Sequence, residues 1–319
     1  MKRHALTALA LSALLPLAAC GGGSSGSGSA SASGGTTDQL TWSMWIAGQE
    51  DQAAWQKVAD AASQGGAKVT IQGAPFTDYW TKLRTQLSGG SAPCIVTIQS
   101  LRAANYSDVL LPLDDLAAKA GTKLDEFDPT ALEGMKVDGK LYALPYDTGP
   151  VVMLYNKDLF DEAGVPEPRP GWTAAEFEAD GEKLKAKNKE LFATSVEDLF
   201  LESQILAYNG GRVIKADGTL DATDAAFAQG LDWDASLVSK GYATQASADG
   251  SADDNAFVNG KVATYVDGPW SLLGTKAKAK FHLGVTSLPA GSTPTTFSAG
   301  SGFGVSKKCQ YPDQAFAAI

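Results

Sequence analysis

The chain has 319 residues, of which 44% are hydrophobic and 19% charged, and its mean hydropathy is −0.11. This composition excludes a disordered acidic chain and a protein with many membrane spans, and the length fits about two domains of roughly 100 to 200 residues. The 26 Lys and Arg residues against 36 Asp and Glu residues leave a net charge of −10. Nucleic acid is therefore disfavoured as a partner, because phosphate binding needs clustered cations. The two His and three Cys residues do not stand at metal-ligand spacing, so we expect no metal site and no cofactor.

The first 20 residues have the pattern of an export signal. Lys2 and Arg3 carry positive charge, residues 5–19 are apolar but too few to span a bilayer, and Leu17-Ala18-Ala19-Cys20 resembles a bacterial lipobox. The resemblance implies a lipoprotein signal peptide over 1–19, cleavage before Cys20 and lipidation of that residue, with 20–37 as a flexible Gly/Ser linker. We expect an extracytoplasmic protein, lipid-anchored to the outer face of the cell membrane. An ordinary secretory leader with a chance cysteine is the alternative.

Strand and helix patterns alternate from residue 40 onward. Residues 40–46, 67–71 and 94–98 are apolar and strand-like. The first helix between them carries Trp55, Val58, Ala59 and Ala62 at helical spacing, and the second carries Tyr79, Leu83 and Leu87. This βαβαβ order predicts a parallel sheet.

The rest of the chain continues as a mixture of strands and helices. Residues 137–142 predict a hairpin with an Asp-Gly turn, and 173–240 are predicted as mostly helical. Further strands are predicted at 151–155, 261–266, 282–286 and 303–306. A helix opening at Pro312 has just begun when the chain stops without a capping signal. We therefore expect a truncated gene product, with a native short C-terminal helix as the alternative.

Six motifs in order resemble the extracellular solute-binding proteins of ABC importers, in the sugar-binding family that includes maltose-binding protein. They are YWTKL at 79–83 with GGSAP at 89–93, LLPLDDL at 110–116, GKLYALPY at 139–146 with LYNKDLF at 154–160, AFVNGKVA at 256–263, DGPW at 267–270, and GSGFGVSKK at 300–308. The resemblance implies an α/β, two-lobe, type II periplasmic-binding-protein-like fold, with hinge strands and a ligand cleft between the lobes. Lobe 1 would hold 38–146 plus 296–319, and lobe 2 would hold 147–295. The family normally continues beyond this length, which supports truncation.

The function implied by the resemblance is that of a substrate-binding lipoprotein, and not of an enzyme. It would be a monomer that captures a neutral sugar or oligosaccharide and delivers it to the transmembrane subunits of an ABC permease. The shortage of Arg and the acidic charge favour a neutral ligand. A secreted carbohydrate-active hydrolase remains open, since two carboxylates suffice for glycoside hydrolysis. A Ser-His-Asp triad would have to use His282, for which a buried or edge structural role is the more common one. A surface sugar sensor without transport is the third alternative.

A sugar site needs aromatic planes for stacking and carboxylates or amides for hydroxyl groups. The loop 99–102 follows the third strand, where open α/β sheets bind ligands, so we expect it to face the cleft, with Gln99 and Ser100 as site residues. The resemblance adds cleft positions at Trp45, Gln49, Glu50, Tyr146, Asp147, Asp198, Phe200, Trp270, Ser301, Gly302 and Phe303. Structural alternatives are a core role for Trp45 and plain hinge roles for 146–147 and 301–303. Trp55 and Trp233 are predicted core residues.

The resemblance also implies a disulfide. In the family's topology a returning strand runs antiparallel beside the third strand, which would bring Cys94 and Cys309 level at one end of the sheet. Disulfides persist outside the cytoplasm. Two buried free thiols are the alternative.

Overall fold

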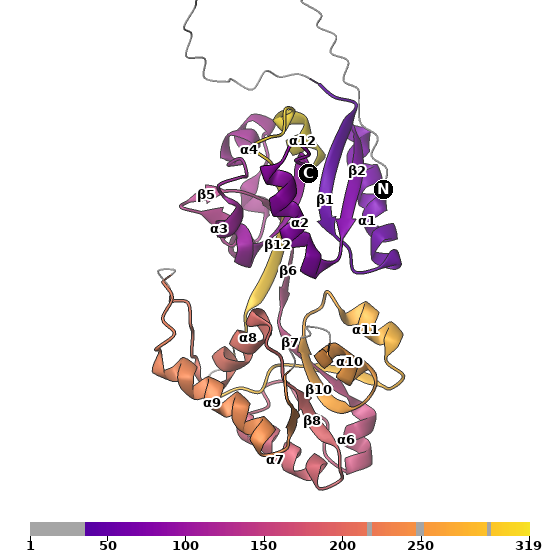
Figure 1. Cartoon of the computed structure of the whole chain (residues 1–319), viewed down its shortest axis with the longest axis vertical. Coiled ribbons are helices and arrows are strands. Elements are labelled where there is room, and N and C mark those ends of the chain that lie inside the picture. Colours follow the sequence, from indigo (N-terminus) through magenta and orange to yellow (C-terminus); the bar gives the residue numbers. More distant parts are fainter. Residues whose placement is uncertain (1–35, 216–218, 247–251, 292–294) are drawn as a thin grey trace, which may run out of the picture. The chain divides into compact units, whose positions relative to one another are not determined.

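The computed structural model describes residues 36–215, 219–246, 252–291 and 295–319. The predicted signal peptide, the predicted lipidation site Cys20 and most of the predicted linker lie outside the described residues. The described part contains two five-stranded sheets, each with its own helices and its own hydrophobic core (Figure 1).

The first sheet has the strand order β2-β1-β3-β12-β6. Strand β1 pairs parallel with β2 and β3, and β12 pairs antiparallel with both β3 and β6. The predicted parallel βαβαβ unit is thus confirmed. The bounds are β1 (Gln39–Trp45), α1 (Gln49–Ala62), β2 (Lys68–Ala74), α2 (Phe76–Ser88), β3 (Ile95–Gln99), β6 (Leu144–Pro150) and β12 (Ser298–Val305).

Helix α2 shows why the helical spacing was informative. Tyr79, Leu83 and Leu87 are its buried residues, and they lie on one face. The Tyr79 hydroxyl donates to the carbonyl oxygens of Ser43 (3.1 Å) and Thr97 (2.7 Å), so it joins α2 to both β1 and β3. Burial raises the pKa of Tyr79 far above its ordinary value. This helix therefore fixes the sheet edge at which β3 ends.

The second sheet has the strand order β11-β7-β10-β8-β9. The prediction that 173–240 is mostly helical is confirmed by α7, α8 and α9, although the range also holds the short strand β8, whose apolar run has no period that separates a strand from a buried helix. The strands are β7 (Val152–Asn156), β8 (Glu190–Ala193), β9 (Ala243–Thr244), β10 (Val262–Asp267) and β11 (Leu283–Thr286). The helices are α6 (Lys157–Ala163), α7 (Ala174–Lys185), α8 (Asp198–Asn209), α9 (Ala225–Ser239), α10 (Ala252–Val258) and α11 (Leu272–Lys278).

The chain passes between the two sheets at two places. Strands β6 and β7 are consecutive in the chain but belong to different sheets. The same holds for β11 and β12. Strand β12 pairs with β6 along its length, so the two crossings lie side by side. The fold is therefore the expected two-lobe α/β arrangement, in which we call the parts around the first and second sheets lobe 1 and lobe 2. The residue boundaries of the lobes stay predictions.

The smaller elements belong mainly to lobe 1. The hairpin of β4 and β5 has Asp138 and Gly139 at φ 50° and 74°, as an Asp-Gly turn requires. Cys94 and Cys309, the expected pair, form a disulfide with a Cα–Cα distance of 4.6 Å. These elements are η1 (Ser63–Gly65), η2 (Ser100–Arg102), α3 (Ala103–Tyr106), α4 (Asp114–Ala120), η3 (Leu124–Glu126), α5 (Pro129–Glu133), β4 (Lys136–Val137), β5 (Lys140–Leu141) and α12 (Pro312–Ala318).

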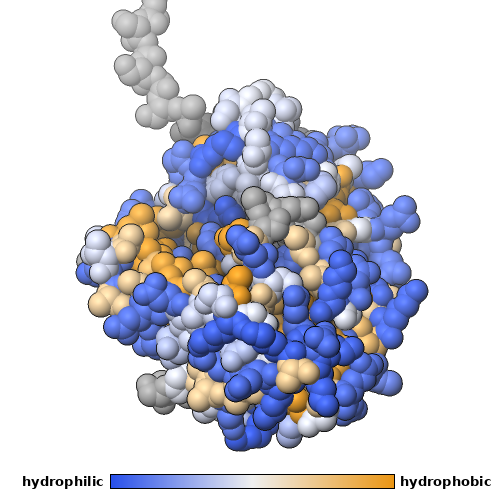
Figure 2. Space-filling model, turned by 60° about the horizontal axis from the view of Figure 1, so that its bottom comes forward, coloured by the Kyte–Doolittle hydropathy of each residue, from blue (hydrophilic) through white to orange (hydrophobic). Residues whose placement is uncertain are grey.

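The surface is largely hydrophilic on the face drawn in Figure 2, where hydrophobic residues gather toward the left. Leu273 and Leu220 are the most exposed large apolar residues described, at 82% and 77%. Within the part of the chain that the structure describes, none of the helices combines the length and the apolar character needed to cross a membrane.

Candidate functional site

A polar pocket lies where the end of β3 and the start of α8 come together. Its empty volume, open solvent included, is about 390 Å³. Lobe 1 supplies residues from the end of β3, from η2 and from α3, while lobe 2 supplies residues from the first turn of α8 and just before it. The lining residues are Gln99, Leu101, Arg102, Asn105, Glu197, Asp198 and Leu199.

Arg102 supplies hydrogen-bond donors to the lobe 1 wall. Its guanidinium lies over the Trp80 ring, 4.7 Å from the ring centroid, which fixes the side chain by a cation–π contact. Its Nε is buried without a hydrogen-bond partner. Among the described residues, Arg102 forms no ion pair. The guanidinium is therefore held in place with donors still available.

Glu197 and Asp198 supply acceptors to the opposite wall. Glu197 is accessible to solvent, but surrounding protein limits the hydration of its carboxylate. This burial, together with the negative charges of Asp198, Asp267 and Asp253, raises the pKa of Glu197 to about 7, although Arg102 lowers it. One oxygen of Asp198 accepts the backbone N–H of Leu199. One wall of the pocket thus donates hydrogen bonds and the other accepts them.

The predicted residues of the crossing strands lie together beside this pocket. Ser301 pairs with both Gln99 and Asp147 in the sheet register, and its N–H donates to Asp147 Oδ1 at 2.7 Å. The rings of Tyr146 and Phe303 are stacked, with centroids 4.5 Å apart. Burial raises the pKa of Tyr146 and of Asp147 above their ordinary values, while hydrogen bonds from Ser301 lower both.

The polar groups of these residues already hold the crossings together. Ser100 Oγ accepts the Gly300 N–H at 3.2 Å, and the buried Gly302 leaves no room for a Cβ, which would lie 2.8 Å from the Leu144 carbonyl oxygen. Of the residues predicted at the end of β3 and on the crossing strands, only Gln99 lines the pocket.

The predicted residues near β1 lie elsewhere. Trp45 is half-buried and packs against Phe76, Tyr79 and Trp80 with centroid distances of 5.3 to 5.5 Å. This placement matches the core alternative, although the cluster continues through Trp80 to Arg102 at the pocket. Gln49 and Glu50 are exposed at the start of α1 and do not line the pocket.

The two residues predicted on α8 separate in the structure. Asp198 lines the pocket. Phe200 is only 6% exposed and packs in the lobe 2 core against Tyr265, so its placement corrects the expectation of a cleft position. Two positions along a helix turn the side chain by about 200°, from the pocket to the core.

Trp270 is 50% exposed in the turn that follows β10. An indole with one free side is suited to stacking on a sugar face.

His282 directly precedes β11 and is not buried. Its side chain is 86% exposed, and its Nδ1 lies 2.7 Å from Oδ1 of Asp158 on α6. Of the two structural roles considered for His282, the structure agrees with the edge role.

Sequence reasoning did not select Arg102, Asn105 or Glu197 as site residues. Arg102 stands in the loop after β3 that the sheet-edge rule pointed to, so a preference for polar side chains there would have found it. Glu197 directly precedes Asp198. The pairing of these two segments across one pocket has no signal in the sequence.

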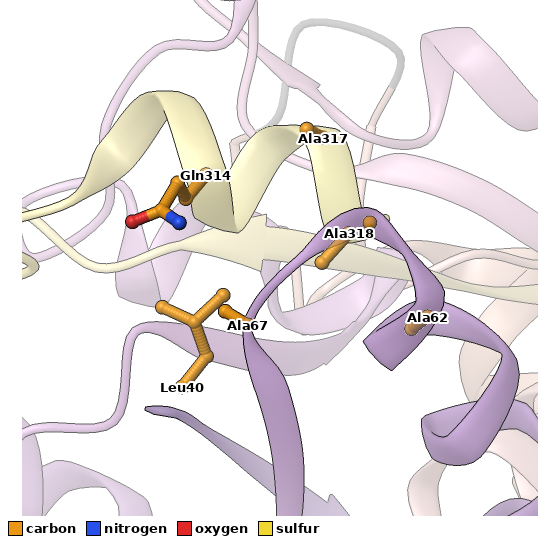
Figure 3. A pocket seen from close by; sticks show the side chains of 7 residues that line it. Leu40, Ala62, Ala67, Gln314, Ala317 and Ala318 are labelled. Carbon is orange, nitrogen blue, oxygen red and sulfur yellow. The ribbon is translucent and has the colours of Figure 1, made fainter. Parts of the chain in front are cut away.

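A second cavity lies at α12 and is a poor sugar site. Figure 3 shows mainly small apolar side chains around it, among them Leu40, Ala62, Ala67 and Ala318. Its amide, Gln314, already bonds with the backbone N–H and C=O of Thr37. The cavity therefore offers no free hydroxyl-binding groups. Within the described ranges, no three His, Cys, Asp or Glu side chains are grouped to hold a metal ion.

Comparisons with known proteins identify the family of this chain. The family described as bacterial extracellular solute-binding protein matches residues 45–319. A relative from Brucella abortus, named as a binding protein, is 27% identical over 251 residues, which cover 74% of this chain and 59% of the relative. The diacetylchitobiose binding protein DasA of Streptomyces coelicolor is 27% identical over 231 residues, which cover 68% and 51%. The chain thus spans about half to three fifths of the length of these curated relatives.

A solved structure shows the same fold. The ABC substrate-binding protein Lmo0181 of Listeria monocytogenes, in complex with cycloalternan, has a TM-score of 0.76 and 27% sequence identity, and the match covers 88% of this chain and 74% of that one. The family match extends over most of the described residues of both lobes. This chain belongs to the bacterial extracellular solute-binding protein family.

Proposed function

We propose that this protein captures a neutral sugar or oligosaccharide in the pocket between β3 and α8 and delivers it to the transmembrane subunits of an ABC importer. The observation that carries the proposal is the division of the pocket into a donor wall at Arg102 and an acceptor wall at Glu197 and Asp198. A sugar hydroxyl both donates and accepts hydrogen bonds, so it can use both walls at once.

The chemistry of the pocket favours an uncharged ligand. Two carboxylates face one guanidinium, and burial of Glu197 among further acidic side chains already disfavours negative charge there. A phosphorylated sugar would add repulsion at this wall. The names of relatives support the carbohydrate class, since one is named for diacetylchitobiose and another was solved with cycloalternan.

We also propose that the protein is anchored at the outer face of the cell membrane. The lipobox-like Cys20 would hold the protein at the outer face of the cell membrane, and the Gly/Ser linker would let the folded part reach a permease. Labelling with a radioactive fatty acid tests this anchoring. A Cys20→Ser variant should incorporate no label and should no longer be recovered in the membrane fraction.

Binding can be tested by calorimetric titration of the protein with a panel of neutral sugars that includes diacetylchitobiose and cycloalternan, and with sugar phosphates for comparison. We expect at least one neutral sugar to bind and the phosphates not to bind. Replacing Arg102 by Gln should weaken binding about tenfold to a hundredfold, because a hydrogen bond from a charged donor contributes about 1.5 to 3 kcal/mol.

The matched control is Arg169→Gln in lobe 2. Arg169 is 71% exposed, bonds Glu176 and does not line the pocket, so its loss should leave affinity unchanged. If the Arg102 and Arg169 variants bind the sugar with equal affinity, Arg102 does not donate hydrogen bonds to the ligand. Recovery of hydrolysed sugar after incubation would favour the hydrolase alternative instead.

A further inference from the structure

The turn after β10 holds Trp270 in one orientation. Asp267 ends the strand at 4% exposure, and its carboxylate accepts the Gly268 N–H at 2.7 Å. Burial raises the pKa of Asp267 to about 6, while hydrogen bonds with Ser271, the Gly268 backbone and the Trp270 side chain lower it. The turn is thus anchored from inside, while Trp270 stays half-exposed.

Gly268 lies directly under the Trp270 ring. A Cβ added to Gly268 would overlap the ring carbons Cη2, Cζ2 and Cζ3 of Trp270. The backbone does not demand glycine here, because Gly268 is not among the described residues with positive φ. The three atoms nearest to an added Cβ therefore all belong to the indole.

Gly149 supports the same turn from the crossing strand β6. A Cβ added to Gly149 would lie 2.8 Å from Pro269 Cγ and 3.4 Å from Trp270 Cε3. Gly149 is buried, pairs with Ala299 of β12, and also lacks a positive φ. The indole and its turn therefore rest against a strand that connects the two lobes.

We infer that Gly149 and Gly268 are positioning residues for Trp270: without side chains, they let the indole lie against its own turn and the crossing strand, and so fix the aromatic face offered to a sugar. The inference rests on the proposed function for its ligand. The positions of the ring and of the two glycines can be tested without any sugar.

The first experiment replaces Gly268 by Ala. Because the backbone accepts Ala and the Trp270 ring is half-exposed, the ring can swing away and the protein should still fold. Acrylamide quenching of tryptophan fluorescence, compared between each variant and the same variant carrying Trp270→Phe, isolates the signal of Trp270. We expect Gly268→Ala to raise the quenching constant of Trp270 about twofold.

Gly274→Ala is the matched control. Gly274 lies on α11 in the same part of lobe 2, without positive φ and with no heavy atom within 4 Å of an added Cβ. This variant should leave the Trp270 signal unchanged. If Gly268→Ala fails to fold, Gly149→Ala is measured in its place, since it meets Pro269 and the edge of the same ring.

The second experiment is a double-mutant cycle on sugar affinity, using the tightest neutral sugar of the panel above. We expect Gly268→Ala to weaken binding about tenfold in the wild-type background and to have no effect once Trp270 is Ala. Equal weakening in both backgrounds, or an unchanged quenching constant of Trp270, would overturn the inference. A changed quenching constant in a protein that binds no sugar would support the positioning of Trp270 and refute the proposed function.

Discussion

The disulfide between Cys94 and Cys309 should contribute a large part of the stability of lobe 1. Cys94 directly precedes β3, and Cys309 follows β12 after a short turn, so the bridge joins neighbouring strands that are far apart in the chain. The Ser306 N–H already donates to the Cys94 carbonyl oxygen at 3.0 Å, so the native positions do not depend on the sulfur atoms alone. Removing the bridge should therefore act mainly on the unfolded chain.

The magnitude follows from the length of the closed loop. With a sequence separation of 215, the chain-entropy relation gives about 5 kcal/mol at 25 °C. Typical domains unfold with about 5 to 15 kcal/mol, so the loss would be severe. The suitable variant is Cys94→Ala with Cys309→Ala, because Cys309 is only 8% exposed and a serine hydroxyl there would need a hydrogen-bond partner.

Urea unfolding of the variant, of the oxidised wild type and of the reduced wild type measures this loss. We expect the first and third proteins to unfold at similar, much lower urea concentrations than the second. A loss below about 1 kcal/mol would refute the loop-entropy reasoning. Two free thiols in the denatured, unreduced wild type would refute the bridge itself.

The other stability predictions concern a buried charge and a helix cap. Burial raises the pKa of Asp234 to about 6 from 3.8, and its Oδ1 has no partner, so this group stabilises the protein below about pH 4 and loses that contribution as pH rises through 6. Relative to Asp234→Asn, the wild type should therefore lose up to about 3 kcal/mol of unfolding free energy between pH 4 and pH 8. Urea unfolding of both proteins across this pH range measures the difference. Unfolding free energies that change with pH by the same amount in the two proteins would contradict this prediction. Thr173→Ala removes the capping box with Glu176 at the start of α7 and should cost about 1 kcal/mol in thermal unfolding, and an unchanged melting temperature would show that the cap is dispensable.

Local sequence patterns identified most elements of lobe 1 because each has a period or a turn of its own. The spacing of Tyr79, Leu83 and Leu87 predicted the buried face of α2, and Asp138-Gly139 predicted a turn that needs positive φ. In lobe 2, Thr173 and Glu176 likewise form the capping box at the start of α7 that their spacing indicates. These signals lie within a few residues, so they can be read without the fold.

Helix α8 shows where such patterns stop being informative. Its buried residues include the consecutive run 203–207, so polar and apolar positions do not separate into two faces. Both Asp198 and Phe200 were predicted as cleft residues, but only Asp198 lines the pocket, whereas Phe200 lies in the lobe 2 core. Which side of this helix meets lobe 1 is decided by the packing of both lobes.

The sequence by itself determined the alternation of strands and helices, the order of the family motifs and the glycine-containing turns, since these depend on neighbouring residues. Only the tertiary structure placed Arg102 opposite Glu197, turned Phe200 into the core and laid the Trp270 ring over Gly268. The physical reason is that these arrangements depend on the packing of side chains and of segments distant in the chain, and neither a period nor a local turn encodes that packing.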